Sequence, residues 1–472
     1  MSHEVFYKVF DFTGNAADIF TLFSEKSYPF LLDSSLKKGV RGRFSFIGFE
    51  PFEIFSASGK DSLYKLAGRY QPYQVDFKNS PTPFAGGLVG FLGYDLGLSL
   101  EGIVPCGSND FSLPDCFFGF YDGIIVLDHL LRKLYVVATG LPERNPALAK
   151  RNAKAKIDDI AKCLDRYSPQ PKDLFQNIDW SKTEDDSEIS FQNNFTRSKY
   201  VHAVEKVLGH IAQGDIYQVN LSQRFLFENR FDFQAKPFEL YQTLSTLSPA
   251  NFGAYFDAQD FQIISHSPEE FLRLKDNHVY TCPMKGTRPR GKDIIEDEIM
   301  KNELLTSAKE RAELLMVTDL ERNDLGRVCD YGSVGVQSMR TLEEYATVFQ
   351  TISVVEGNLR KDKGLFDLIK ACFPSGSVTG CPKIRSMQII DQIEQTRRGP
   401  YTGSLGYIGF NGDMDFNILI RTLVKKDNQI FFHAGGGIVA DSVPEREYEE
   451  TLVKAKALRR AIQQTFLKKI KV

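Results

Sequence analysis

The stretch GIIVLDHLLRKLYVVATG (residues 123–140) is rich in β-branched and aromatic residues and is broken by Gly and Asp, which is typical of strands. GGLVGFLGY (86–94) has the same character, so strands are expected to dominate the first 160 residues. Further strands are predicted at FQIIS (261–265), NHVYTC (277–282), GSLGYIGF (403–410) and FNILIRTLV (416–424). Because strands and helices do not alternate in strict βα units, the sequence predicts an α+β fold built on large antiparallel sheets rather than a doubly wound one.

Helices are expected in the second half of the chain. An apolar stripe recurs at helical spacing in TRSKYVHAVEKVLGHIAQG and stops at Gly214, with a strand predicted from Tyr217 to Phe225. A charged helix is predicted from Ile295 to about Val317, and a last helix from about Pro444 to Leu467. The segment from 166 to 194 has no apolar period and is crowded with Pro, Asp, Ser and Asn. It is interpreted as a linker or surface loop between an amino-terminal region (1–165) and a second domain (195–468).

The charge balance favours chemistry on small molecules. Lys and Arg number 58 and Asp and Glu number 61, so no net field would hold a nucleic acid or an anionic membrane. The start of the chain has no basic and apolar leader, and no apolar run approaches the length of a membrane span, so a cytoplasmic protein is expected. The seven cysteines are scattered without zinc spacing, which is typical of thiols in a reducing compartment.

Two pairs of glutamates lie at i, i+3 spacing on predicted helices, which places both carboxylates of a pair on one helix face. The pairs are Glu310 with Glu313 and Glu447 with Glu450. Carboxylate oxygens suit magnesium, which accepts a few of them and keeps waters. The alternative is a solvated helix face, since Asp293 and Glu296 show the same spacing with nothing else to recommend them.

CPMKGTRPRG (282–291) places Lys285 beside glycine, with Arg288 and Arg290 following. A lysine amine becomes a useful nucleophile when desolvation or neighbouring cations lower its pKa. The segment supplies those cations, although a solvated basic turn explains the same composition.

The glycine clusters FPSGSVTGCPK (373–383) and HAGGGIVADS (433–442) expose backbone N–H groups that an anion can approach closely, or they are simply turns. Arg421 lies within the apolar stretch LIRTL. Its guanidinium is therefore either paired in the core or available to a carboxylate ligand.

Taken together, these blocks resemble the chorismate-binding domain shared by anthranilate synthase component I, aminodeoxychorismate synthase component I, and the isochorismate and salicylate synthases. The resemblance covers about 195–468. It rests on DIYQVNLSQRF, ISHSPEEF, CPMKGTRPRG, SAKERAELLMVTDLERNDLGRVC, FPSGSVTGCPKIRSMQIID, RRGPYTGSLGYIGFNGDMDFNILIRTL and AGGGIVADSVPEREYEET. LLDSS, GGLVGFLGYD and DHLLRKL make the first half similar to the amino-terminal region of the aminating members. The family's fold is a sandwich of large antiparallel sheets with helices outside.

Two positions bear on the reaction that the resemblance implies. The isochorismate and salicylate synthases carry a lysine base where this chain has Gln218, and a glutamine cannot deprotonate water. Anthranilate synthases usually have a small residue where this chain has Lys285. The lysine and the order Ser377-Val378-Thr379-Gly380 are similar to the aminodeoxychorismate synthases. Amination of chorismate to 4-amino-4-deoxychorismate, for p-aminobenzoate and folate, is therefore expected, with anthranilate synthesis as the alternative.

The resemblance also implies roles for single residues. Lys285 is expected to be a covalent nucleophile and Glu269 to protonate the departing hydroxyl. Mg²⁺ is expected on Glu313 and Glu450 directly and on Glu310 and Glu447 in an outer shell. The expected substrate contacts are Thr287, Ser377, Thr379, Tyr401, Arg421 and the backbone at Gly435, Gly436 and Gly437.

Three further expectations come from the same resemblance. Gln350 stands where the family usually has a histidine, so an electrostatic role at that position is in doubt. LLDS (31–34) is similar to the segment with which relatives hold tryptophan, which makes Ser34 a candidate contact, although SPANF (248–252) departs from the second such segment. No cysteine lies in a nucleophile elbow, so a separate glutamine amidotransferase subunit is expected to supply ammonia. A non-catalytic chorismate-binding module is disfavoured, because Glu269, Lys285 and the four glutamates are all present.

Overall fold

The computed structural model describes residues 2–34, 42–167, 189–228, 236–345 and 348–467. Most of the predicted linker at 166–194 lies outside these residues. Two large sheets, of twelve and ten strands, form the body of the protein, and every pairing described within them is antiparallel. The short strands β1 (Ser2–Glu4) and β6 (Asp76–Lys78) form a separate parallel pair.

The twelve-stranded sheet combines strands from both ends of the chain. In spatial order its strands are β11 (Gln192–Asn193), β12 (Gln218–Glu228), β24 (Gln429–Ile438), β23 (Thr422–Lys426), β14 (Phe261–Ser267), β13 (Phe252–Asp257), β3 (Phe30–Asp33), β4 (Phe44–Gly48), β9 (Ile124–Asp128), β10 (Lys133–Ala138) and β2 (Phe6–Asp11), with β20 (Gly380–Cys381) paired to β12.

The ten-stranded sheet also combines strands from the two halves of the chain. Its order is β17 (Met284–Pro289), β19 (Val348–Asn358), β16 (His278–Thr281), β15 (Glu270–Lys275), β22 (Met414–Asn417), β21 (Ser404–Gly409), β7 (Gly87–Leu92), β8 (Cys116–Tyr121) and β5 (Glu53–Ala57), with β18 (Gly335–Glu344) paired to β19. The amino-terminal region and the region after 195 therefore share both sheets.

Alternation along the strands explains why the two sheets stack as a sandwich. Ile124 and Val126 of β9 point into a core that also contains Val89 and Phe91 of β7, from the opposite sheet. Their neighbours Ile125 and Leu127 point to the other side, into a core formed with helices. Successive side chains of a strand face opposite ways, so apolar residues at both kinds of position bury both faces of a sheet. The predicted sandwich with outer helices is confirmed.

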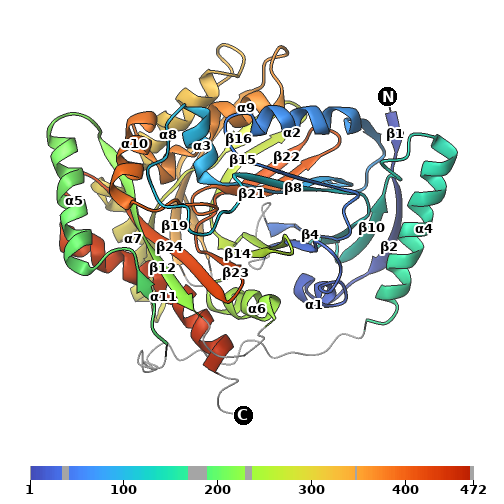
Figure 1. Cartoon of the computed structure of the whole chain (residues 1–472), viewed down its shortest axis with the longest axis horizontal. Helices are drawn as coiled ribbons and strands as arrows, with labels where there is room; N and C mark the ends of the chain where they lie inside the picture. The colour runs from blue at the N-terminus through green and yellow to red at the C-terminus, as the bar shows by residue number, and fades with distance from the viewer. Residues whose placement is uncertain (1, 35–41, 168–188, 229–235, 346–347, 468–472) are drawn as a thin grey trace.

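Helices cover the outer faces of both sheets (Figure 1). Side chains of α1 (Ala16–Thr21), α4 (Pro146–Leu164), α6 (Pro237–Leu247) and α11 (Pro444–Leu467) pack on the twelve-stranded sheet. Those of α2 (Ser62–Tyr70), α3 (Tyr94–Leu100), α8 (Ala308–Gly326) and α9 (Leu365–Cys372) pack on the ten-stranded sheet. A fourth core joins α3 with α5 (Arg197–Ala212), α10 (Lys383–Glu394), β12 and β24. The remaining elements are α7 (Ile294–Thr306) and the 3-10 turns η2 (Gln71–Tyr73) and η3 (Gly376–Val378).

The helix predicted from Ile295 to Val317 is two helices, α7 and α8. The break is at Ser307, whose extended backbone ends α7 and whose hydroxyl accepts a hydrogen bond from the N–H of Glu310 at 3.3 Å. A serine in this geometry caps a new helix rather than continuing the old one. The helices predicted before Gly214 and after Pro444 are confirmed as α5 and α11.

Arg421 also differs from its prediction as part of a continuous strand. It lies between β22 and β23 with φ of 50°, in the left-handed region. Its carbonyl accepts the N–H of His266 at 3.2 Å. Separately, none of the described helices combines the length and the apolar character that a membrane span requires.

Candidate active site

Lys285 lies on β17, at the edge of the ten-stranded sheet, where the strand passes close to α8. The register with β19 shifts between Lys285 and Thr287, and the intervening Gly286 has φ of 84°. A Cβ atom at Gly286 would lie 2.3 Å from Oε2 of Glu310. Only glycine therefore fits between the strand and the acidic face of the helix.

Lys285 is half-buried, and its amine points at the loop after α9. Its Nζ donates to the carbonyl of Ser377 at 3.4 Å. Burial lowers the pKa of Lys285, and the charge of Lys454 adds to this, while the carboxylates of Glu313 and Glu269 oppose it. A larger share of neutral amine is what a nucleophile needs.

The predicted cause of this lowered pKa is wrong in part. Arg288 forms an ion pair with Glu310 at 2.9 Å, and Arg290 pairs with Asp297. Both guanidinium groups are thus engaged by carboxylates, and desolvation with Lys454 lowers the pKa of Lys285 instead.

Glu269 occupies the connection between β14 and β15 and is 4% exposed. Burial raises the pKa of Glu269 to about 7, although the Ser377 hydroxyl and the Lys285 charge act in the opposite direction. Its Oε1 has no hydrogen-bond partner among the described residues. The carboxyl can therefore stay protonated near neutral pH and donate its proton to a ligand, as a general acid must.

Two buried amides lie near Lys285 with their polar atoms unpaired in the described part of the chain. They belong to Gln218 of β12 and Gln350 of β19. A Cβ atom at Gly437 would lie 2.9 Å from Nε2 of Gln218 and 3.7 Å from Nζ of Lys285. Because buried polar atoms normally find partners, these unpaired groups mark a candidate place for a polar ligand.

The glycines of β24 line the same space. A Cβ atom at Gly436 would lie 3.2 Å from Oε1 of Glu450 and 3.3 Å from Oε2 of Glu447. β24 pairs with β12 over its whole length, including Gly435, but with β23 only as far as Phe431. One edge of the glycine segment is consequently left without a neighbouring strand in the described residues, in agreement with an anion contact there.

The predicted metal ligands come from two helices, α8 and α11. Burial raises the pKa of Glu313, and the neighbouring charges of Glu310 and Glu450 raise it further. Burial and Glu450 likewise raise the pKa of Glu447. Burial acts to raise the pKa of Glu450 too, but Lys454, which pairs with it at 2.7 Å, outweighs this and holds that pKa below its ordinary value.

The carboxylates thus feel one another's charge, and basic side chains neutralise several of them. Lys309 lies 3.9 Å from Glu313, and Arg288 holds Glu310. Among the described residues, no three His, Cys, Asp or Glu side chains lie close enough together to hold a metal ion. The donor set is nevertheless the all-oxygen kind that a hard cation takes, so the magnesium site stays a prediction.

The remaining predicted contacts differ in their surroundings. Tyr401 is buried and stacks on His433 with ring centroids 4.9 Å apart. Arg421 donates to Ser248 Oγ at 3.5 Å, and within the described residues it pairs with no carboxylate. Burial lowers the pKa of its guanidinium. Thr379 is buried, and its carbonyl accepts the N–H of Asn220 at 2.8 Å. Thr287 is exposed, directly opposite Gln350 in the sheet.

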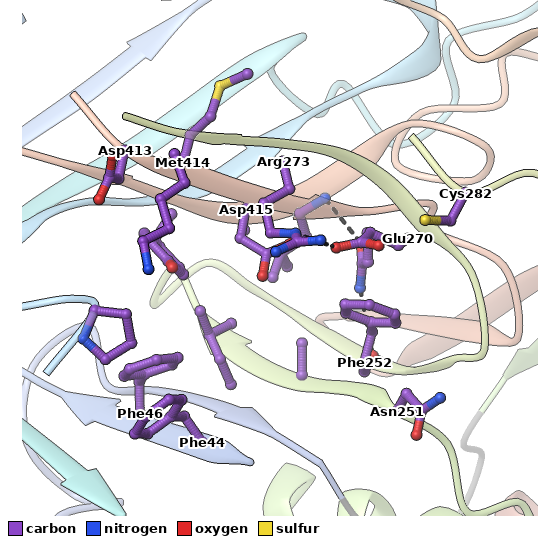
Figure 2. A pocket seen from close by; sticks show the side chains of 18 of the residues that line it. Phe44, Phe46, Asn251, Phe252, Glu270, Arg273, Cys282, Asp413, Met414 and Asp415 are labelled. Carbon is purple, nitrogen blue, oxygen red and sulfur yellow. Dashed lines mark hydrogen bonds and ion pairs between the residues drawn. The ribbon is translucent and has the colours of Figure 1, made fainter. Parts of the chain in front are cut away.

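A separate cavity of about 450 Å³ lies between the two sheets. Figure 2 shows Phe44, Phe46 and Phe252 on one side and Glu270, Arg273 and Asp415 on the other. Arg273 donates to Glu270 at 3.0 Å. Asp33 lines the cavity. Ser34, the predicted regulatory contact, follows Asp33 in the chain and is buried, but it is not among the residues that line the cavity.

Sequence reasoning missed several groups of the site. Lys454 follows Glu450 by four residues on α11, a spacing that favours an ion pair and that could have been noticed. Ser375 and Glu321, which lie behind Ser377, gave no comparable signal.

Comparisons with known proteins support the resemblance. The family described as chorismate binding enzyme matches residues 28–460. The chain is 36% identical to anthranilate synthase component 1 of Acetivibrio thermocellus, with 94% of this chain and 92% of that protein aligned. It is 37% identical to aminodeoxychorismate synthase component 1 of Bacillus subtilis, with 91% of each aligned.

Solved structures of related proteins are similar to this chain as well. Anthranilate synthase component I from Streptococcus pneumoniae superposes with a TM-score of 0.74 at 32% identity, covering 89% of this chain and 92% of that one. The menaquinone-specific isochorismate synthase of Escherichia coli, at 17% identity, shares the fold with a TM-score of 0.71 and covers 98% of this chain and 95% of that one.

Proposed function

Since this chain belongs to the chorismate-binding enzyme family, we propose that it aminates chorismate at C4 and so acts as an aminodeoxychorismate synthase component I. One observation carries the proposal: the half-buried Lys285 amine has a lowered pKa and lies near the carboxyl of Glu269, whose pKa is raised to about 7. A hydroxylating reaction is disfavoured because Gln218 has no basic group with which to activate water.

The proposed amination proceeds through two displacements on the chorismate ring. The neutral Lys285 amine forms a bond to C2 while the ring double bonds shift, and the C4 hydroxyl leaves as water with the proton of Glu269. Ammonia then adds at C4, the double bonds shift back, and the C2–N bond breaks to return the electron pair to Lys285. Arg421, with no carboxylate partner in the described residues, is suited to hold a carboxylate of the substrate.

Magnesium would be held by Glu313 and Glu450, with Glu310 and Glu447 outside them, and would supply a positive charge for the ring carboxylate. The raised pKa values of Glu313 and Glu447 support this assignment, because a cation would relieve the repulsion among the carboxylates.

Anthranilate synthesis is the second candidate, because relatives with that name are as similar to this chain as the aminodeoxychorismate synthase is. Incubation of the purified chain with chorismate, Mg²⁺ and ammonium separates the two. Fluorescent anthranilate would overturn the first proposal, whereas non-aromatic aminodeoxychorismate is the expected product.

We further propose that ammonia comes from a separate glutamine amidotransferase subunit. The cysteines support this: Cys116, Cys282, Cys329 and Cys372 are buried, burial raises the pKa of the Cys381 thiol, and a hydrogen bond with Asp391 raises the pKa of the exposed Cys106 thiol. A glutaminase nucleophile needs the opposite, an accessible thiol with a lowered pKa.

The cavity between the sheets is our candidate for the tryptophan site. Its phenylalanines suit an aromatic side chain, and the carboxylates of Asp33 and Glu270 suit an α-ammonium group.

A further inference from the structure

Glu269 does not end the hydrogen-bonded network of the site. The hydroxyl of Ser377 faces the Glu269 carboxyl closely enough to act against the rise of its pKa. The hydroxyls of Ser377 and Ser375 lie 3.0 Å apart, and Ser375 donates to Oε1 of Glu321 at 3.0 Å. Two serine hydroxyls thus connect two buried carboxyl groups, one on the β14–β15 connection and one on α8.

The turn that carries the serines is fixed closely against α8. A Cβ atom at Gly376, between them, would lie 2.2 Å from the side chain of Leu320, next to Glu321. All four members of the chain are at most 4% exposed. Water therefore does not compete for these hydrogen bonds, and the geometry favours proton passage along them.

Glu321 differs from a buried carboxylate that serves only the fold. Asp122 accepts three hydrogen bonds, from the N–H and hydroxyl of Thr139 and the N–H of Gly140. The hydrogen bonds described for Glu321 include one donor, Ser375, and no ion pair joins it to a described cation. A carboxyl so placed costs free energy when ionised, so it holds its proton more firmly than an ordinary glutamate.

The charged and titratable groups around Glu321 come from four elements. Asp324 of α8 lies beside it, and Lys383 of α10 pairs with Asp324. Cys372 at the end of α9 and Glu269 face it as well. Burial, Asp324 and Glu269 raise the pKa of Glu321 to about 7, while Lys383 and Ser375 act to lower it. Both carboxyls therefore change protonation in the same pH range, and each disfavours ionisation of the other.

We propose that Glu321 is the proton reservoir of the site and reprotonates Glu269 through the hydroxyls of Ser375 and Ser377. This rests on the proposed function, in which Glu269 gives up a proton in every turnover. For the transfer the Ser375 hydroxyl turns from the orientation in which it donates to Glu321. Protonated Glu321 then donates to Ser375, Ser375 passes its own proton to Ser377, and Ser377 passes its proton to the Glu269 carboxylate. Each hydroxyl gains one proton and loses one, and Glu321 becomes the carboxylate, which takes a proton from solvent before the next turnover. Because it acts through Glu269, Glu321 is a positioning residue rather than a catalytic one.

Infrared difference spectroscopy of the full-length protein during a pH titration tests the link without turnover. The protonated-carboxyl bands are assigned by their loss in Glu269→Gln and Glu321→Gln. In Glu321→Gln the midpoint of the Glu269 band is expected to fall by roughly half a pH unit or more, because a neutral amide replaces a neighbouring negative charge. In Ser375→Ala the midpoint of the Glu321 band is expected to rise, because the carboxylate loses its donor. Unchanged midpoints in both variants overturn the link.

Turnover with ammonium then tests the relay. Ser375→Ala is expected to lower kcat roughly 10-fold or more with KM for chorismate unchanged within about twofold. Ser265→Ala, which removes another buried hydroxyl that bonds Thr422 at 2.8 Å, is expected to keep the wild-type kcat. Wild-type kcat in Ser375→Ala overturns the relay. If the wild-type protein does not aminate chorismate, the proposed function fails, while the infrared midpoints still decide whether the two carboxyls are linked.

Discussion

Glu269 and Glu270 are consecutive residues whose carboxyl groups lie at two different places in the protein. Glu269 lies against Lys285 and Ser377, whereas Glu270 lines the cavity between the sheets and accepts a hydrogen bond from Arg273. Adjacent residues at the start of a strand point to opposite sides, so this one step in the chain connects the candidate active site to the cavity.

Free tryptophan is expected to raise the thermal midpoint of the protein, because a ligand that binds only the folded state stabilises it. The measurement is a thermal-shift titration, with alanine as the control ligand. Glu270→Gln should weaken the shift, because it removes a charge from the wall of the cavity. The absence of any shift at millimolar tryptophan would remove this ligand from consideration.

Lys285→Ala is expected to lower ammonia-dependent turnover about 100-fold or more, because the nucleophile is lost. Intact-protein mass spectrometry of enzyme incubated with chorismate without ammonia should show an adduct in the wild type that the variant lacks. Lys292→Ala changes an exposed lysine nearby and should keep both adduct and rate. Full activity of Lys285→Ala would exclude the covalent route.

Magnesium dependence should separate the four glutamates. Glu313→Gln and Glu450→Gln are expected to reduce the rate more than Glu310→Gln and Glu447→Gln. The reason is that loss of an outer-shell partner typically lowers metal affinity or activity by only about 10- to 100-fold. Titrating Mg²⁺ against rate gives an apparent affinity for each variant. Glu298→Gln, an exposed acid on α7, is the control. Equal and mild effects in all four variants would favour the alternative, in which these glutamates form a solvated helix face and bind no metal.

At a fixed concentration of free ammonia, the loss of the Glu269 proton as the pH rises through about 7 should lower the rate, against the opposite effect of the Lys285 amine, which becomes neutral as the pH rises. The sign follows from the role of an acid, which is active only when protonated. At fixed total ammonium the opposing rise in free ammonia masks this limb, so the free base must be held constant. Glu269→Gln should be slow throughout and lack the limb; a limb that persists in the variant would assign it to another group.

Purified chain should use ammonium but not glutamine until an amidotransferase subunit is added. The reason is that four of the cysteines are buried and that the thiols of Cys106 and Cys381 have raised pKa values, whereas a glutaminase needs an accessible thiol with a lowered pKa. The measurement is product formation from each nitrogen source, before and after addition of the partner. Glutamine-supported turnover by rigorously purified single chain would contradict the prediction.

Asp95→Asn is expected to reduce the pH dependence of stability. Burial raises the pKa of Asp95 to about 7, from an ordinary value of 3.8, so the folded state binds a proton that the unfolded state releases. This contribution is complete below about pH 4 and is lost as the pH rises to about 7. The loss in free energy of unfolding between about pH 5 and pH 8 should shrink by about 3 kcal/mol, measured by denaturant titration. The exposed Asp158→Asn should not change it.

The fold class and several elements could be predicted because they depend on local pattern. The stripe that ends at Gly214 and the pattern after Pro444 specify α5 and α11. The break at Ser307 was missed although Ser307 and Glu310 have the Ser-x-x-Glu spacing that marks the start of a helix. Lys285 and Glu269 were found through the motifs around them. The path from Glu321 to Glu269 could not be found in this way, because it joins α8, the turn after α9 and the β14–β15 connection only after folding.

The shared sheets limit how this protein can be divided. β13 pairs with β3 and β21 pairs with β7, so a fragment beginning near residue 195 would expose one unpaired strand edge in each sheet. Open edges of this kind invite aggregation. The same geometry suits fragment complementation, because fragments 1–165 and 195–468 carry strand edges that pair with each other in both sheets. Expressed together, the two fragments are expected to form one sandwich, as the halves of a split reporter must.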